Sequence, residues 1–432
     1  MKRKGLAVGI ILLLVGTVII PSSRQNVYGK ASLPISGKTI YVDDNNTQGP
    51  WDGTLEHPYR IIQDGVNASV NGDTVFVFNG TYYESILVNK SINLFGEEKH
   101  QTVIDGGGGT ETNMVVQLQD ANGTNISGFT IQNGGSNGIG VLIQSNNNTI
   151  TNNIIGSNHT LCLRVDKGYN IIANNTILSG RDGIALISNY NIVADNTILA
   201  KEIALDLMDT YNTIIGNTIQ NAAVYTIYDE GGGHNLISRN IISNNSYDGI
   251  TVFESNNDII TDNVIFSNEG SGVAISQECW DTNVSGNIIT SNGYFGIAIG
   301  NGILMFDAAR TSVYGNILTN NGRSGVTLMG RETKIIGNTI SNNHYGILSY
   351  SNKKNIIEKN NIMNNSVNAF FRYQIVEAIF GTTLWDANYW GAPQQKSVMI
   401  PGRIGVILCI LPWFPQYDNN PAQVPYDIPG TR

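Results

Sequence analysis

Short aliphatic segments recur along most of the chain, each three to five residues long and bounded by Asn, Gly, Ser or Asp. Segments this short, between residues that favour turns and left-handed backbone angles, are typical of β-strands joined by tight turns. Asn and Gly are unfavourable in helix interiors, whereas Ile favours strands. The pattern therefore predicts an all-β fold.

The segments repeat with a period of about 22 residues. Each period also holds a Gly-aliphatic pair such as Gly249-Ile250 and an Ile pair such as Ile259-Ile260. Three strands and three turns fill the period and leave no room for a helix. One period is longer, because an insertion lies between Gly300 and Ala309, and we expect it to bulge from the surface. The period is marked by x-Asn-(Thr/Ile/Val)-(Ile/Leu) at Asn153, Asn175, Asn196, Asn217, Asn240, Asn263, Asn287, Asn316 and Asn338, with a near match at Asn360.

Stacked coils pair each strand with its equivalent in the next coil, about 4.8 Å away, and give three long parallel sheets. The sequence thus predicts a single-stranded parallel β-helix, a three-sheet solenoid with Ile inside. A leucine-rich repeat has a similar period, but each repeat needs a Leu-dominated consensus and a helical segment, and the repeats of this chain have neither.

The recurrent Asn residues have a structural explanation in this fold. An Asn at the same turn of successive coils can donate a hydrogen bond to one neighbour and accept one from the other, which satisfies buried amides. We therefore expect a structural ladder, and no sugar-binding role, for Asn196, Asn217, Asn240, Asn263, Asn287, Asn316, Asn338 and Asn360.

Both ends of such a stack need caps, because they would otherwise expose unpaired strands and an open core. Residues 38–110 are predicted to form the N-terminal cap and first coils, with a strand at 39–42 and a short amphipathic helix around Ile61, Ile62, Val66 and Val70. Residues 111–366 hold the repeats, and residues 367–432 form an aromatic and Pro-rich C-terminal cap. Its aromatic residues close the core or present a glycan platform, and they are Phe370, Phe371, Tyr373, Trp385, Tyr389, Trp390, Trp413 and Phe414.

Residues 1–29 contain a basic start and an uncharged apolar run from Gly5 to Ile20. This pattern is typical of a signal peptide or of an N-terminal membrane anchor. We expect an exported protein at the cell surface, in a periplasm or outside the cell, which meets the membrane only through this segment. The three cysteines, Cys162, Cys279 and Cys409, are too few and too far apart for a disulfide framework.

The charge balance narrows the range of partners. The chain has 25 Lys and Arg against 34 Asp and Glu, a net charge of −9. It offers no broad basic surface for a phosphate backbone, which argues against nucleic acid.

The N-terminal region resembles a known family. Its motifs are Tyr41-Val42-Asp43-Asp44, Asp52-Gly53-Thr54, Pro58-Tyr59, residues 72–77, Gly80-Thr81-Tyr82 and Gly96-Glu97. Together with residues 385–391 near the other end, they are similar to pectin-lyase-like right-handed parallel β-helix proteins, and more narrowly to exported NosD-like proteins with carbohydrate-binding and sugar-hydrolase-type repeats. The resemblance implies the right-handed fold over residues 38–430, and it implies glycan or copper binding as activities.

Copper is poorly supported by the supply of ligands. Copper sites need clustered His, Cys or Met, and the five His residues are scattered. The best local pair is His159 with Cys162, whose side chains need not converge on one face of a strand. The histidines are His57, His100, His159, His234 and His344.

The most suggestive chemistry is a row of acids after the Gly-aliphatic strands of consecutive coils. It consists of Asp209, Asp229, Glu230, Glu254 and Glu278, with Tyr211, Tyr228, Phe253 and Trp280 nearby as candidates for stacking on sugars. Two interpretations stay open: a calcium-assisted or acid–base glycan site, and a solvated acidic edge.

We therefore expect a protein that binds or scaffolds a polysaccharide or cell-surface glycan. A polysaccharide lyase or glycoside hydrolase, with catalytic residues unknown, is the alternative, and a NosD-like copper accessory protein ranks third.

Overall fold

The computed structural model describes residues 37–107, 114–135, 137–156, 160–178, 180–300, 308–374, 381–406, 409–411 and 416–428. The predicted signal peptide or anchor, His159, most of the predicted insertion, Trp413 and Phe414 lie outside these residues. Within them, no helix has the length and apolar character needed to cross a membrane.

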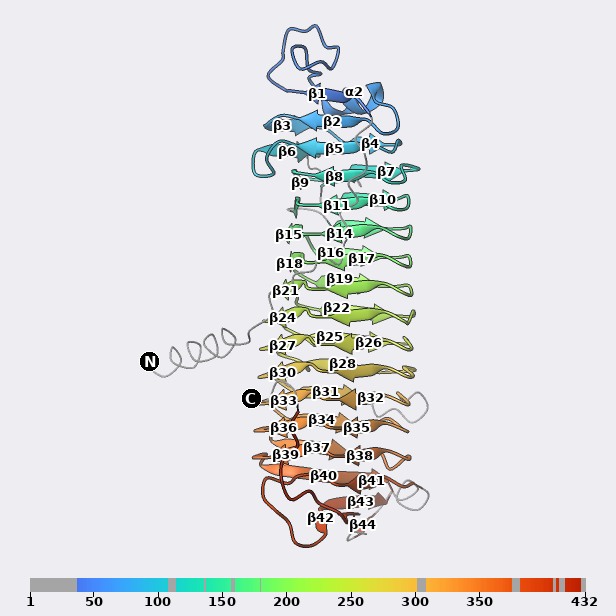
Figure 1. Ribbon diagram of the computed structural model, residues 1–432, viewed down its shortest axis with the longest axis vertical. Helices are drawn as coiled ribbons and strands as arrows, with labels where there is room; N and C mark the ends of the chain where they lie inside the picture. Colours follow the sequence, from blue (N-terminus) through green and yellow to red (C-terminus); the bar gives the residue numbers. More distant parts are fainter. Residues whose placement is uncertain are drawn as a thin grey trace, which may run out of the picture. The chain divides into compact units, whose positions relative to one another are not determined.

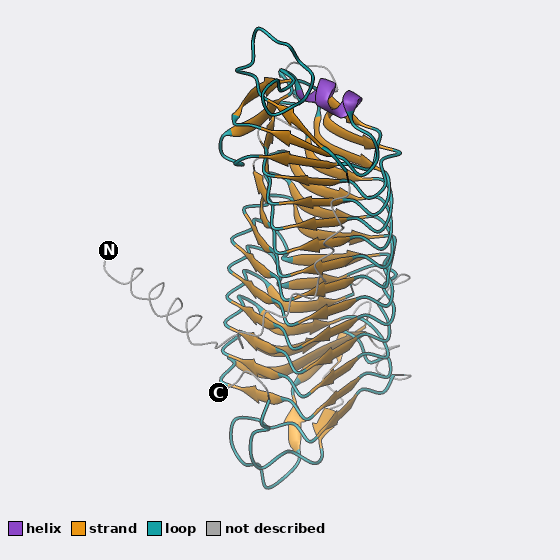
Figure 2. Ribbon diagram, turned by 45° about the horizontal axis from the view of Figure 1, so that its top comes forward, coloured by secondary structure: helices purple, strands orange, loops and turns teal. Residues whose placement is uncertain are grey.

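The described chain forms a solenoid of about 12 turns whose strands lie in three sheets (Figures 1 and 2). Neighbouring strands are parallel, apart from two antiparallel pairs in the C-terminal region, β42–β45 and β43–β44. Nearly every coil therefore contributes one strand to each sheet, as the period predicts.

Sheet A contains β1 (Thr39–Val42), β2 (Thr74–Val77), β5 (Asn93–Gly96), β8 (Asn125–Ser127), β11 (Thr149–Thr151), β14 (Ile171–Ala173), β17 (Ile192–Ala194), β20 (Thr213–Ile215), β23 (Leu236–Ser238), β26 (Ile259–Thr261), β29 (Asn283–Ser285), β32 (Ser312–Tyr314), β35 (Lys334–Ile336), β38 (Ile356–Glu358), β41 (Leu384–Asp386), β42 (Val398–Ile400) and β45 (Gln416–Asp418).

Sheet B contains β3 (Gly80–Tyr83), β6 (Thr102–Asp105), β9 (Thr130–Gln132), β12 (Ile154–Gly156), β15 (Thr176–Leu178), β18 (Thr197–Leu199), β21 (Thr218–Gln220), β24 (Ile241–Ser243), β27 (Val264–Phe266), β30 (Ile288–Thr290), β33 (Ile317–Thr319), β36 (Thr339–Ser341) and β39 (Asn361–Met363).

Sheet C contains β4 (Ile86–Val88), β7 (Met114–Gln119), β10 (Ile139–Gln144), β13 (Leu161–Val165), β16 (Asp182–Leu186), β19 (Ile203–Leu207), β22 (Tyr225–Glu230), β25 (Ile250–Phe253), β28 (Val273–Ile275), β31 (Phe295–Ile299), β34 (Ser324–Leu328), β37 (Tyr345–Ser349), β40 (Val367–Gln374), β43 (Gly402–Val406) and β44 (Cys409–Leu411).

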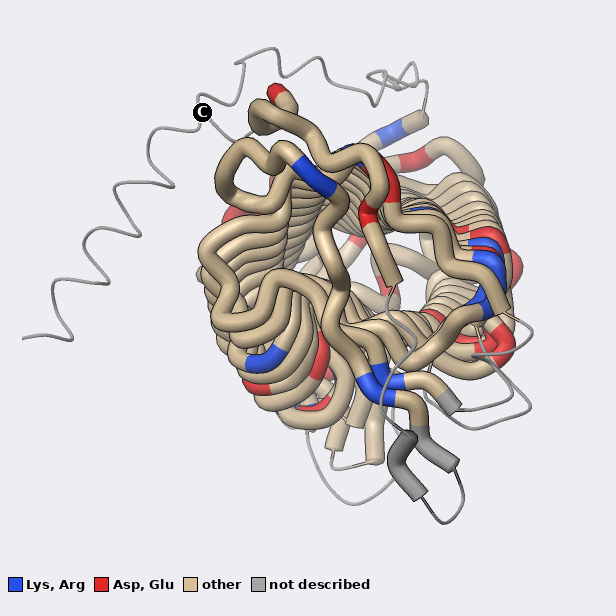
Figure 3. Tube along the Cα trace, turned by 90° about the horizontal axis from the view of Figure 1, so that it is seen from below, with Lys and Arg blue, Asp and Glu red and all other residues tan. Residues whose placement is uncertain are grey.

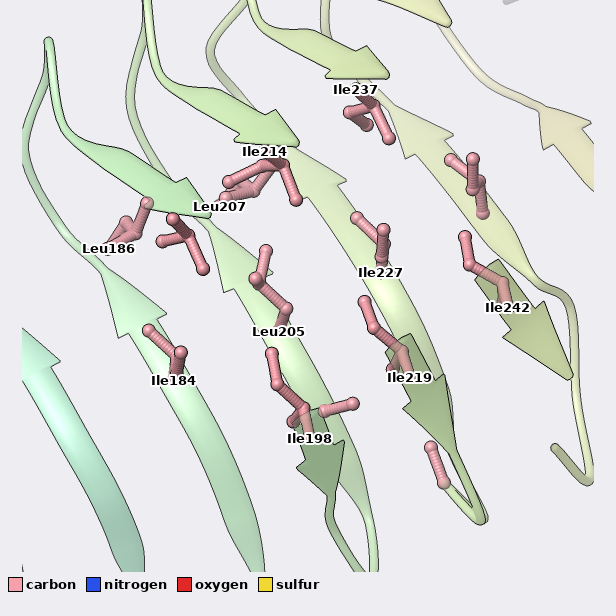
Figure 4. Close-up of a cluster of buried hydrophobic side chains, with 14 of the residues drawn as sticks. Ile184, Leu186, Ile198, Leu205, Leu207, Ile214, Ile219, Ile227, Ile237 and Ile242 are labelled. Carbon is pink, nitrogen blue, oxygen red and sulfur yellow. The ribbon is translucent and has the colours of Figure 1, made fainter. Parts of the chain in front are cut away.

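The core is built from rows of equivalent side chains. In sheet C, Ile184, Leu205 and Ile227 occupy one register position of consecutive strands, and each is buried. Figure 4 shows these residues stacked beside Leu186 and Leu207, which form a second inward row. Each row continues the apolar packing of the coil before it, so a strand of three residues is stable here although it would not be stable alone.

The turns explain the abundance of Asn. The residue before each ladder Asn has a left-handed backbone, as in Asp195 (φ 52°) and Asp262 (φ 57°). The Asn that follows points inward and is buried; for example, the Asn240 side-chain amide donates to Asn263 Oδ1 over 3.0 Å. Equivalent hydrogen bonds connect successive coils from Asn175 to Asn388. The first is 3.1 Å long, the last is 2.9 Å, and those between them are 3.0 Å. This is the ladder expected from the sequence.

The N-terminal cap is a helix lying on the first strands. Helix α2 (Ile62–Ala68) begins and ends close to the predicted positions and buries Ile62 and Val66. Its first turn is held by Glu84, which accepts hydrogen bonds from the backbone N–H groups of Ile62 and Gln63 at 2.7 and 2.9 Å. Ile61 and Val70, which we expected on its apolar side, are exposed because they flank the helix.

The C-terminal aromatic residues close the core. Phe371, Tyr373, Trp385 and Trp390 are buried. The indole of Trp385 donates to Gln416 over 2.7 Å, so a buried polar group of the cap is also satisfied. The burial of these four side chains favours the interpretation as a hydrophobic cap and argues against an exposed glycan platform.

Candidate functional site

The outward face of sheet C departs from the repeat in four consecutive coils. Strands β13, β16, β19 and β22 carry Arg164, Asp182, Asp206 and Glu230 at outward positions. Arg164 and Asp206 share a register position that holds Ala274 in β28 and Ala298 in β31, whereas Asp182 and Glu230 lie at two other positions of their strands. In a view along the stack, charged residues follow the outside of the coils (Figure 3). Charge therefore interrupts the repeat at one place on this face.

Asp206 is the most unusual of these acids. Its carboxylate atom Oδ1 is buried and has no hydrogen-bond partner. Burial, together with the negative charges of Glu230 and Asp182, raises the pKa of Asp206 to about 6. A carboxyl group that titrates in this range can both hold and release a proton near neutral pH, and such groups concentrate at functional sites.

Aromatic side chains adjoin Asp206 on the next coil. Tyr228 is its register partner, and Tyr225 lies on the same strand. The two phenol rings stack with centroids 4.2 Å apart, and Phe253 of β25 lies 6.4 Å from Tyr228. This cluster gives the face an apolar surface with hydroxyl groups beside a titratable carboxyl group.

Positive charge at the other side of Asp206 is already paired. Arg164 donates to Asp166 over 2.7 Å. Arg181 contacts Asp182 at 3.1 Å and Glu202 at 3.6 Å. Because both guanidinium groups have carboxylate partners, the face keeps its acidic character around Asp206.

The predicted acidic row is only partly present. Glu254 is exposed, and Asp209, Glu230 and Glu278 are partly exposed near the end of sheet C. The prediction is wrong for Asp229, which is 0% exposed and occupies the inward position of Leu207. Strand β22 extends to Glu230, so alternation directs Asp229 into the core and Glu230 to the surface.

The aromatic candidates also differ from one another. Tyr211 cannot stack on a sugar, because the rings of Tyr190 and His234 cover its two faces. Their ring centroids lie 5.1 and 4.7 Å from the centroid of Tyr211. Trp280 is exposed, and the guanidinium of Arg310 lies 5.9 Å from its ring centroid. Tyr228 and Phe253 remain the candidates that lie next to Asp206.

The turn after sheet C carries a second departure from the repeat. Tyr169, Tyr190, Tyr211 and His234 have left-handed backbones and stack ring on ring at 5.1, 5.1 and 4.7 Å. The equivalent position one coil later holds Asn257 (φ 62°), the usual residue for this conformation. The aromatic turn and the charged face of sheet C occupy the same four coils.

Metal ligands do not gather in the described part of the chain. No three His, Cys, Asp or Glu side chains converge there to hold an ion. Cys162 and Cys279 are buried free thiols, and burial raises their pKa to about 12. Cys162 points into the core, and its proposed copper partner His159 lies outside the described residues.

Two shallow hollows lie elsewhere. One, of about 400 Å³, is lined by Phe95, Glu97 and Lys99 among others. The second, of about 300 Å³, lies over Tyr314 and Lys334 on sheet A. Neither contains the acids or aromatic residues of sheet C. An extended polymer can bind on an open surface and does not require a closed cavity. The face of sheet C therefore remains the better candidate for a binding site.

Three parallel sheets in successive coils define a parallel β-helix protein. The family described as a right handed beta helix region matches residues 162–302 and 298–377, half of the chain, and the chain belongs to this family. No curated protein matches the sequence.

Solved structures share the fold at low sequence identity. An alginate lyase of family PL6 in complex with a trisaccharide is 12% identical, with 89% of this chain and 92% of the lyase covered and a TM-score of 0.50. The A-module of mannuronan C-5 epimerase AlgE4 from Azotobacter vinelandii is 15% identical over 90% and 98% of the two chains, with a TM-score of 0.41. Pectin methylesterase from carrot is 11% identical over 52% and 82%, with a TM-score of 0.36. The likeness to the alginate lyase, at a TM-score of 0.50, concerns the fold alone.

Sequence reasoning missed Asp206 and Tyr225. Both lie on the strand and not in the turn, and their chemistry appears only when strands are aligned position by position. The position after the inward aliphatic residue of Ile184, Leu205, Ile227 and Ile250 reads Ala185, Asp206, Tyr228 and Thr251 in four coils, and that change could have been found in the sequence.

Proposed function

We propose that this protein binds a glycan on the outward face of sheet C, around β13 to β25. The observation that carries the proposal is Asp206, a partly buried carboxyl group with an unpaired oxygen, beside the Tyr225–Tyr228 aromatic pair. Sugars are bound by apolar ring faces together with a small number of hydrogen-bonding groups. The solved structures of the same fold named for a lyase, an epimerase and an esterase agree with a glycan as partner.

A neutral glycan fits this face better than an anionic one. Arg164 and Arg181 are paired with Asp166, Asp182 and Glu202, so most of their positive charge is already balanced by carboxylates of the protein. An anionic chain would also meet the charge of Glu230. Binding at the cell surface or outside the cell is part of the proposal, through the signal peptide or anchor predicted in residues 1–29.

Binding is tested by retention of the protein in native gels that contain single polysaccharides, over neutral and anionic polymers, with and without calcium. We expect retention by a neutral polymer, and a loss of at least about fivefold in affinity in Tyr228→Ala, because stacking on one aromatic face is worth about 1–3 kcal/mol and 1.4 kcal/mol is tenfold. Tyr83→Ala is the matched control, since Tyr83 is 75% exposed on β3. Equal retention of both variants would exclude this face.

A second candidate is a glycan-cleaving enzyme, which the raised pKa of Asp206 favours. In that reaction a protonated Asp206 gives its proton to the glycosidic oxygen, which keeps the electron pair of the breaking bond. Water adds to the sugar carbon and loses a proton to a second carboxylate, for which Glu230 on the next coil is the candidate.

Cleavage is tested by measuring new reducing ends from the polymer that is retained. Asp206→Asn should abolish release without abolishing retention, and the native rate should fall as the pH rises above about 6. Asp262→Asn, at an exposed turn that tolerates Asn, is the control. If the native protein releases no reducing ends from any retained polymer, the chain is a binding protein.

A further inference from the structure

The core of the solenoid contains one acid in an otherwise aliphatic row. The inward row of sheet C reads Leu186, Leu207, Asp229, Val252 and Ile275 in consecutive strands. Figure 4 shows the two leucines that precede Asp229 among the other aliphatic side chains. Asp229 is 0% exposed. An isolated carboxylate at such a position is very unfavourable, so the side chain needs a partner or a proton.

The nearest charged partner is a second buried acid. Ser255 Oγ lies between the two carboxyl groups, 3.1 Å from Asp229 Oδ1 and 2.7 Å from Asp258 Oδ2. Asn235 contacts both, with its side-chain amide 2.9 Å from Asp229 Oδ1 and its backbone N–H 3.0 Å from Asp258 Oδ1. The second oxygen of Asp229, Oδ2, is buried without a partner. Two carboxyl groups this close and this dry cannot both be ionised without strong repulsion.

The pair is more than a way to end an Asn ladder. Asp258 stands where earlier coils have Asn191, Asn212 and Asn235, and it accepts the backbone N–H of Asn235. Asp418 ends the other ladder in the same manner, since its Oδ2 accepts from Asn388 and from the Trp390 indole. That ladder ends on a single acid. A second buried acid is therefore not required for termination, and Asp229 needs another explanation.

Other titratable groups surround the pair without neutralising it. Burial raises the pKa of Asp258 to about 6, and the exposed His234, on the turn after β22, opposes this rise only in part. Cys279 is buried on the next turn, where desolvation keeps its thiol protonated. Glu230 and Glu254 lie on the same two coils at the surface. Burial and mutual repulsion raise the pKa of Asp229, so the pair holds a proton that exposed acids would lose.

We propose that Asp229 and Asp258 form a proton-operated latch, which keeps the turns 231–235 and 254–258 packed on the core in acid and lets them open locally as the pH rises. Loss of the shared proton leaves two like charges in the core, and opening of the turns hydrates them. Because β22 carries Tyr228 and Glu230, the latch lies directly beneath the face of sheet C. The latch itself does not depend on what that face binds.

The chain contains its own reporter for this opening. Cys279 is buried next to the pair, whereas Cys162 is buried in β13, three coils away from β22. Both thiols have a pKa raised to about 12 by burial. The experiment is alkylation of the full chain with iodoacetamide from pH 5 to pH 8, with the label on each cysteine measured by peptide mass spectrometry. Iodoacetamide reacts with the thiolate, so the ratio of the Cys279 rate to the Cys162 rate cancels the general effect of pH on thiol ionisation.

We expect this ratio to rise at least tenfold between pH 5 and pH 8. The equilibrium constant for local opening rises by up to about tenfold per pH unit over the range in which the closed pair holds a proton that the open pair has lost. In Asp229→Leu, which restores the residue of the preceding coil, the ratio should stay flat. Asp258→Asn, which restores the ladder residue, provides the same test if the first variant does not fold. Glu254→Gln, an exposed acid of the same turn, should behave as the native protein.

A flat ratio in the native protein would overturn the latch. So would a pH-dependent ratio that persists in Asp229→Leu or, if that variant does not fold, in Asp258→Asn. Glycan retention takes no part in this measurement, so the latch and the proposed binding face succeed or fail separately.

Discussion

Replacement of one ladder residue, Asn263→Ala, tests how much the Asn ladder stabilises the stack. The Asn263 side chain makes four hydrogen bonds. Its Oδ1 accepts from the backbone N–H and the side-chain amide of Asn240, at 2.9 and 3.0 Å. Its amide donates to Ile237 O at 2.9 Å and to Asn287 Oδ1 at 3.0 Å. Alanine removes all four.

The cost follows from the groups left behind. The backbone N–H of Asn240 and one of the two N–H groups of its amide lose their acceptor, and the carbonyl of Ile237 loses a donor, all in the dry interior. Each buried polar group left unsatisfied costs about 1–3 kcal/mol, and three such groups give about 4 kcal/mol with partial relaxation. This is a large share of the stability of a typical domain.

Amide hydrogen exchange measures the loss coil by coil, which matters because a solenoid need not unfold in a single step. A loss of 4 kcal/mol corresponds to about a thousandfold faster exchange of the Asn240 N–H, since 1.4 kcal/mol is tenfold. Coils at the far ends of the stack should change little. The matched control is Asn283→Ala, because Asn283 points outward from β29 and its replacement should cost less than about 0.5 kcal/mol.

A rise in exchange below tenfold at Asn240, or an equal effect in Asn283→Ala, would refute the argument. Either result would mean that the apolar rows alone hold the coils together and that the amides contribute register without stability.

Three further predictions concern pH and the C-terminal end. Because the folded-state pKa of Asp206 is raised to about 6, the folded protein binds more protons than the unfolded chain between about pH 4 and pH 6. The thermal stability of the native protein should therefore fall as the pH rises through this window. Thermal unfolding of Asp206→Asn should show a weaker fall. Trp385→Ala should cost about 3–5 kcal/mol in urea unfolding, because it leaves a cavity under the last coil, and a cost below 1 kcal/mol would show that the cap is not part of the core. The Asp418 carboxylate accepts hydrogen bonds from the Asn388 backbone N–H, the Asn388 amide and the Trp390 indole. Asp418→Asn places an amide that also carries donors against these groups, so amide exchange in β41 should become faster than in Asp386→Asn.

The architecture was predictable because each structural role is repeated many times. Ile at inward positions and Asn after a left-handed turn recur in coil after coil, so one irregular period does not hide the rule. The short helix at Ile62 was also visible, since its apolar spacing stands alone in the chain. Ile61 and Val70 were misassigned because spacing alone does not show where a helix of two turns begins and ends.

The site was harder to predict because it consists of exceptions to the repeat. Asp229 was assigned to the surface since acids rarely occupy a core, and only the length of β22 shows that it points inward. Tyr211 was considered for sugar stacking, but its neighbours in adjacent coils cover its faces, a contact between residues about 21 positions apart. Asp206 was missed since a lone acid on a strand has no motif, and its pKa depends on burial by neighbouring coils.

The Asn ladder has a direction. Each Asn–Asn bond runs from the amide of one coil to Oδ1 of the next coil, so every coil offers an Asn donor on one side and an Asn acceptor on the other. A duplicated coil would carry the Asn donor and the Asn acceptor that its two neighbours need. The end of the stack, in contrast, is closed by a different group, the acceptor Asp418. The number of coils is therefore free to change through gene duplication, and the length of the surface can change in steps of one coil without redesign of either cap.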